Sequence, residues 1–168
     1  MDTIDYGMLI LRVWLGIVML FHGVNHARNL AGTASWFASK GFARPEAHAR
    51  LSAAGEVAVG VGLAAGLLTS FAAAGLIATM FVAFWTIHRF AGFFVFARPD
   101  EGFEYVATLA VAAVTVAVVG PGDLSLDAVF GFADGFDGWV GLAVGLGGVA
   151  AAALQLAVFW RRPAAASS

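Results

Sequence analysis

Residues 51–68, LSAAGEVAVGVGLAAGLL, decide the fold, because they form an apolar run that a single carboxylate, Glu56, interrupts. A helix needs about 20 mostly apolar residues to cross the hydrocarbon core of a bilayer, and this run approaches that length. A carboxylate within such a run is costly in contact with lipid, so it faces the interior of a helical bundle and finds a polar partner. The stretch therefore predicts a membrane helix whose acid is paired elsewhere in the chain.

The composition is that of an integral membrane protein. Hydrophobic residues make up 61% of the 168 residues and charged residues 12%, whereas a soluble domain carries about 25% charged residues. The chain has no cysteine, which excludes a disulfide, a thiolate metal site and a c-type haem attached to this chain. A redox role would therefore need a bound cofactor, a quinone or a partner protein.

Five apolar segments predict five transmembrane helices and hence an all-α integral membrane bundle. The segments are residues 7–27, 51–68, 71–90, 105–119 and 139–160. The fourth ends at Gly120-Pro121-Gly122, a combination that stops helices. We divide the chain into residues 1–138, a four-helix core with an outer loop, and residues 139–168, an additional transmembrane helix with a cytoplasmic tail.

The basic residues support this count. With five spans, eight of the nine Lys and Arg residues fall on one side of the membrane, including Arg89 and Arg98 after the third span. The ninth, Arg12, lies inside the first span. The positive-inside rule then places the N-terminus outside and the C-terminus in the cytoplasm.

Ionisable residues are expected to gather at the cytoplasmic ends of the first four spans. They are His22, His26, Glu56, His88, Arg89 and Glu104. A rise of about 1.5 Å per residue places His22 and Glu56 at one level, about 7 Å inside the membrane. Such a cluster is either a buried network that fixes helix register or a functional site. Imidazole and carboxylate suit Zn or Fe, but no spacing matches a metal motif, so no metal site is predicted. His48 is expected to be solvated in a polar connection.

Arg12 stands apart from this cluster. It lies about 22 Å from the cytoplasmic end of its helix, in the outer third of the bilayer. Its candidate partners are the acids Asp5, Asp123 and Asp127. We predict a structural ion pair between Arg12 and Asp127 that ties the last loop to the first helix.

Four stretches resemble the DoxX family of small bacterial membrane proteins over roughly residues 7–131. They are LILRVWLGIVMLFHGVNH (9–26), AAGEVAVGVGLAAGLLTS (53–70), GFEYVATLAVAA (102–113) and GPGDLSLDAVFG (120–131). The family motifs fall on Arg12, Gly16, His22, Gly23, Glu56, Glu104, Gly120, Gly122, Ser125 and Asp127. The resemblance implies a four-helix bundle in the bacterial inner membrane, to which residues 139–160 add a fifth helix.

The resemblance also implies a function. Some relatives are named as a subunit of a thiosulfate:quinone oxidoreductase, and similar actinobacterial proteins are placed in a membrane complex with a superoxide dismutase and a thiosulfate sulfurtransferase. We therefore expect a membrane subunit of an oxidoreductase complex of sulfur metabolism or oxidative stress. The alternatives are a non-catalytic anchor that recruits soluble enzymes and, with less support, a small permease. The expected partners are the lipid bilayer and other subunits, or a second copy, with no nucleic acid.

In the oxidoreductase interpretation the His and Glu cluster would bind a quinone, as the cofactor, or a small anionic sulfur substrate, and the chain's own enzymatic role stays open. The proton donors would be His22, Glu56 and Glu104, and the head-group site would be lined by His26, Trp85, His88 and Arg89. A pocket between the first and third spans would favour this interpretation. A dry, fully paired Glu56 would favour the anchor.

Overall fold

The computed structural model describes residues 2–96 and 101–163, and within these ranges the chain is helical, with one isolated β-bridge between Phe42 and Trp160. The elements are α1 (Thr3–Arg28), α2 (Leu30–Ser39), α3 (Pro45–Ala65), α4 (Thr69–Thr86), the 3-10 helix η1 (His88–Phe90), α5 (Glu104–Val119), α6 (Leu126–Phe130), the 3-10 helix η2 (Ala133–Gly135) and α7 (Gly138–Phe159). The predicted all-α membrane bundle is confirmed.

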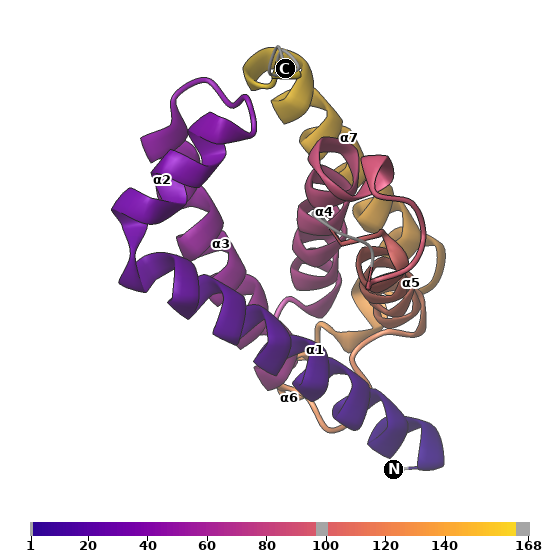
Figure 1. Ribbon diagram of the computed structural model, residues 1–168. Helices are drawn as coiled ribbons and strands as arrows, with labels where there is room; N and C mark the ends of the chain where they lie inside the picture. Colours follow the sequence, from indigo (N-terminus) through magenta and orange to yellow (C-terminus); the bar gives the residue numbers. More distant parts are fainter. Residues whose placement is uncertain (1, 97–100, 164–168) are drawn as a thin grey trace.

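The helices form two groups. Figure 1 shows α1 and α3 side by side with α2 at one end of the pair, while α4, α5 and α7 pack together beside them. The groups meet in a shared apolar core that takes Leu15 from α1, Leu63 from α3, Leu76 from α4 and Val116 from α5, all at most 2% exposed. Two residues at the same level of the bundle are therefore neighbours only if their helices pack together.

Among the residues that the structure describes, three helices are long and apolar enough to cross a membrane. They are α1, α4 and α7, and they correspond to the first, third and fifth predicted spans. The helix α5 is apolar but has 16 residues, and the 21-residue α3 contains Arg50 and Glu56. The crossing of the membrane by α3 and α5 stays a prediction.

The bounds of α3 and the end of α4 differ from the sequence prediction. The helix α3 begins at Pro45, before the apolar run, because proline suits the first turn of a helix. It ends where Gly66 adopts a left-handed conformation, with φ of 65°. The third predicted segment does not continue to residue 90, since α4 ends at Thr86 and residues 88–90 form η1.

The end of α7 is attached to the connection between α2 and α3. Ala43 donates a backbone hydrogen bond to Phe159 O at 2.8 Å, and Arg161 donates one to Gly41 O at 3.0 Å. The Trp160 indole donates to Lys40 O at 2.8 Å. Figure 1 shows the end of α7 beside this connection. The division at residue 138 stays a prediction, but α7 packs within the same bundle.

Candidate functional site

The partner of Glu56 is His26. His26 Nδ1 lies 3.1 Å from Glu56 Oε2, and the side chains are 26% and 5% exposed respectively. Ser52 Oγ lies 3.2 Å from the same His26 nitrogen and donates a hydrogen bond to Glu56 Oε1. Within the described residues Glu56 Oε2 makes no regular hydrogen bond, so the contact with His26 is the polar interaction described for that oxygen. A buried acid thus holds an imidazole that is still partly accessible.

Helical spacing and close helix packing produce this arrangement. Ser52 and Glu56 are four residues apart on α3, so they share one face. That face reaches α1 because glycines bring the two backbones together. A Cβ atom on Gly23 would lie 2.7 Å from Val57 N, and one on Gly16 would lie 2.7 Å from Gly60 O. Small residues at helix contacts allow such close approach in membranes, and here they bring α3 within reach of His26.

His22 lies beside this pair without a described bond to Glu56. Its ring is edge-on to the His26 ring, with centroids 6.5 Å apart, and the residue is exposed. The prediction placed His22 at the level of Glu56, and the structure places it one helical turn from the imidazole that contacts this acid. Ser52, which sequence reasoning missed, could have been found from its four-residue spacing to Glu56.

The other predicted site residues form a second group around η1. His88 Nδ1 lies 2.6 Å from Glu101 O, and Glu104 Oε2 accepts a hydrogen bond from Val95 N at 3.1 Å. The Arg89 guanidinium stacks on Trp85, with its central carbon 4.0 Å from the ring centroid.

Within residues 2–96 and 101–163, no hydrogen bond or ion pair links this second group to His26 and Glu56. The expected single cluster is therefore two groups, because α1 pairs with α3 whereas α4 packs on α5 and α7 (Figure 1). In the same described ranges, no three His, Asp or Glu side chains gather as metal ligands would.

Arg12 is fully buried at the opposite end of the bundle. Its guanidinium donates to four carbonyl oxygens, which belong to Leu63 at 3.2 Å, Ala64 at 3.1 Å, Pro121 at 3.0 Å and Leu124. The first two lie in the last turn of α3, where carbonyl groups carry partial negative charge, and Leu63 O also accepts a hydrogen bond from Gly66 N at 3.2 Å. Arg12 therefore joins α1 to the end of α3 and to the loop after α5.

Asp127 is 4% exposed and lies at the same junction. Its carboxylate accepts hydrogen bonds from Leu68 N at 2.7 Å and Thr69 N at 2.8 Å, which caps the start of α4. The described hydrogen bonds of Arg12 and Asp127 thus go to backbone groups, although the opposite charges attract through space. We propose that Arg12 and Asp127 pair as predicted, but that their opposite charges interact across this shared junction without a direct hydrogen bond.

His48 is buried, so the expectation that it is solvated is wrong. The residue is 6% exposed, and Gln155 Nε2 lies 3.1 Å from its Nδ1. Its ring packs against Phe42 and Phe159, with centroids 5.1 and 5.2 Å away. The cause is the attachment of α7 to the α2–α3 connection. Gln155 is 107 residues away in sequence, and no local pattern predicts a contact at that separation.

The burial of His48 predicts an acid-sensitive contact. Burial lowers the pKa of His48 from its usual 6.5, so its contribution to stability is full above about pH 6.5 and declines as the pH falls below it. His48→Gln should lower stability by about 1 kcal/mol at pH 7.5 through lost packing. The difference from wild type should shrink towards pH 5, as thermal unfolding in detergent would show. A constant difference across this range would contradict the prediction.

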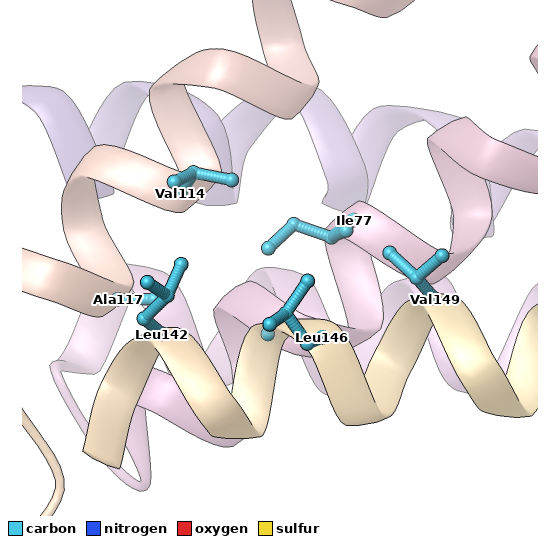
Figure 2. A pocket seen from close by; sticks show the side chains of 7 residues that line it. Ile77, Val114, Ala117, Leu142, Leu146 and Val149 are labelled. Carbon is cyan, nitrogen blue, oxygen red and sulfur yellow. The ribbon is translucent and has the colours of Figure 1, made fainter. Parts of the chain in front are cut away.

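A small apolar cavity of about 40 Å³ lies among α4, α5 and α7. Figure 2 shows its apolar side chains, and the lining residues are Ile77, Val114, Ala117, Leu142, Gly145, Leu146 and Val149. It presents no polar group that could recognise a quinone head group. It also lies away from the interface of α1 with α4, where the sequence analysis placed a diagnostic pocket.

The structure combines apolar helices long enough to cross a bilayer, a buried arginine that joins three segments, and a His–Glu pair. These features define a small helical membrane protein. The DoxX family model matches residues 7–89, and the chain belongs to the DoxX family. The match includes Arg12, His26 and Glu56 and ends before Glu104 and Asp127, so the resemblance beyond residue 89 stays a prediction. Neither a curated protein nor a solved structure gives a significant match to the chain.

Proposed function

We propose that the protein is the membrane subunit of a quinone-linked oxidoreductase complex, and that His26, held by the buried Glu56, is its quinone-facing proton donor. DoxX proteins are small membrane proteins often linked to oxidoreductase-associated functions. This membership supports the general assignment. The quinone, a sulfur or oxidative-stress pathway and the partner enzymes are parts of the proposal.

The observation that supports the proposal most is the asymmetric setting of His26. Both described polar contacts of its ring use Nδ1, which faces Glu56 and Ser52. The ring remains 26% exposed, so Nε2 is the nitrogen that an external carbonyl oxygen could reach. A buried carboxylate stabilises the protonated imidazole, which can then donate a proton from Nε2.

Quinone reduction to quinol takes up two electrons and two protons. In this proposal His26 would supply the two protons one after the other to the quinone oxygens, and it would be reprotonated each time from the aqueous side through the exposed His22. The electrons come from a redox partner protein. The assignment of Glu104, Trp85, His88 and Arg89 to the same site stays a prediction that this proposal does not use, because these residues belong to the group around η1.

The proposed orientation has the His26 end of the bundle in the cytoplasm of a bacterial cell. The attachment of Arg161 to Gly41 supports this orientation, because it places the basic C-terminal segment beside the basic connection between α1 and α3. Arg98, which the sequence argument also used, lies outside the described residues.

A specific observation also favours the anchor as a second candidate function. Glu56 is nearly inaccessible, and its oxygens face His26 and Ser52. The described cavity is apolar and lies elsewhere. A buried pair of this kind can have a purely structural role, which here would be to hold α1 against α3. The protein would then recruit soluble enzymes without binding a quinone.

Purification in mild detergent with mass spectrometry of co-purifying lipids, quinones and proteins tests the proposal. The wild type should retain a quinone, and Glu56→Gln should lose it while the helix content remains unchanged. Glu46→Gln is the matched control, because it makes the same change at an exposed position of α3. Quinone retained by Glu56→Gln would contradict the proposal. Stoichiometric soluble enzymes without quinone would identify an anchor.

A further inference from the structure

Two arginines from distant parts of the chain converge on one aromatic ring. Arg89 belongs to η1, and Arg162 follows α7. Their guanidinium carbons lie 4.5 and 4.4 Å from the centroid of the Phe90 ring. The two positive groups are therefore at most about 9 Å apart, since both lie within 4.5 Å of the same ring centre.

The described part of the chain places no carboxylate in an ion pair with these two arginines. Arg89 Nε is also buried without a hydrogen-bond acceptor. Contacts with aromatic faces offset part of the charge, but they do not satisfy a buried N–H group, which normally has a partner. Converging like charges and an unsatisfied donor both indicate a missing anion.

The chemistry of the two side chains selects the kind of anion. The planar guanidinium group presents a fork of N–H donors that matches the oxygens of a phosphate, with charge-assisted hydrogen bonds of about 2.8 Å. Two such groups on either side of one phosphate would use donors that the protein itself leaves open. Phe90 is 47% exposed, so the space around this ring is accessible from outside.

The surroundings place this phosphate at the membrane surface. Arg89 lies against Trp85, near the end of α4, and its guanidinium carbon is 6.0 Å from the ring of Trp160 at the end of α7. Tryptophan is enriched at the head-group level of bilayers, and basic pockets at this level bind anionic lipid head groups. We propose that Arg89 and Arg162 bind the phosphate of an anionic phospholipid, independently of the quinone proposal.

The test measures binding of short-chain phosphatidylglycerol to the full chain in detergent by native mass spectrometry, with thermal unfolding as a second readout. Arg89→Gln and Arg162→Gln should each weaken binding by about tenfold or more, because each removes charge-assisted hydrogen bonds. Arg162 follows the last helix, so its variant tests the site even if Arg89→Gln fails to fold. Short-chain phosphatidylcholine should bind wild type more weakly than phosphatidylglycerol does.

Arg161→Gln is the matched control. It removes the same charge at the neighbouring position, where the guanidinium hydrogen-bonds to Ala157 O and Trp160 O instead of facing Phe90. Equal weakening by Arg161→Gln would show general charge attraction and overturn the proposal. Wild-type binding that does not distinguish the two lipids would also overturn it. If inorganic phosphate binds as tightly and with the same dependence on both arginines, the lipid assignment is wrong and the site takes a free oxyanion.

Discussion

Replacing Arg12 with methionine is expected to destabilise the protein by about 3–5 kcal/mol or to prevent its assembly, because the side chain is fully buried and bonded to four carbonyl groups. Methionine retains a long apolar side chain but donates no hydrogen bond. Ala64 O, Pro121 O and Leu124 O would lose the donor that Arg12 supplies, each at a cost of about 1–3 kcal/mol, whereas Leu63 O would keep its hydrogen bond from Gly66 N. Yield of monodisperse protein and the unfolding midpoint in detergent measure the effect.

Arg28→Met is the matched control for Arg12→Met. Arg28 lies on the same helix but is exposed in its last turn, so this substitution should change the unfolding midpoint little. Arg12→Lys should give an intermediate result, because an ammonium group cannot reproduce the fixed fork of a guanidinium. If Arg12→Met unfolds at the wild-type midpoint, the junction does not hold α1, α3 and the loop together.

Gly23→Ala is the second substitution with a large expected effect. The added methyl group would lie 2.7 Å from Val57 N and 3.0 Å from Ala53 O. Both are backbone atoms of α3, so α1 and α3 would have to move apart, at a cost of about 1–3 kcal/mol. The separation would also lengthen the contact between His26 and Glu56. We expect a lower unfolding midpoint and, if the quinone proposal is correct, loss of the retained quinone.

Gly55→Ala makes the same chemical change on α3, where no atom lies within 4 Å of the new methyl group. It should leave stability unchanged or raise it slightly, because alanine favours the helix. Quinone retention should also remain at the wild-type level. A Gly23→Ala protein that matches Gly55→Ala in stability would show that the α1–α3 contact tolerates expansion.

The position of a residue along its helix could be predicted from the sequence, because helix rise is constant. From these positions the sequence analysis correctly placed Glu56 beside the end of α1 that carries the histidines, and placed Arg12 away from that end. It could not show which helices are neighbours. The choice of His26 as the partner of Glu56 depends on the close approach at Gly23, and the separation of His88 and Glu104 depends on the packing of α4 against α5 and α7.

His48 illustrates a second limit. A histidine in a connection with charged neighbours is usually solvated, and nothing within several residues of His48 indicates burial. Its cover comes from Phe159 and Gln155 at the other end of the chain. Arg12 shows the opposite case, because a charge inside an apolar run must have partners whatever the fold. The sequence therefore indicates that Arg12 has buried partners, whereas only the structure identifies them as four carbonyl groups.

The attachment of α7 to the α2–α3 connection determines the order in which contacts can form while the chain is synthesised. The acceptors Lys40 O and Gly41 O are made early, but Trp160 and Arg161 emerge from the ribosome only after the other helices. Until then the aromatic surface around His48 lacks the cover that Phe159 provides. The first helices can enter the membrane earlier, but this corner of the molecule closes only when synthesis has reached the last helix. Synthesis of residues 160 and 161, rather than insertion of the first spans, is therefore the step after which this corner of the bundle can close.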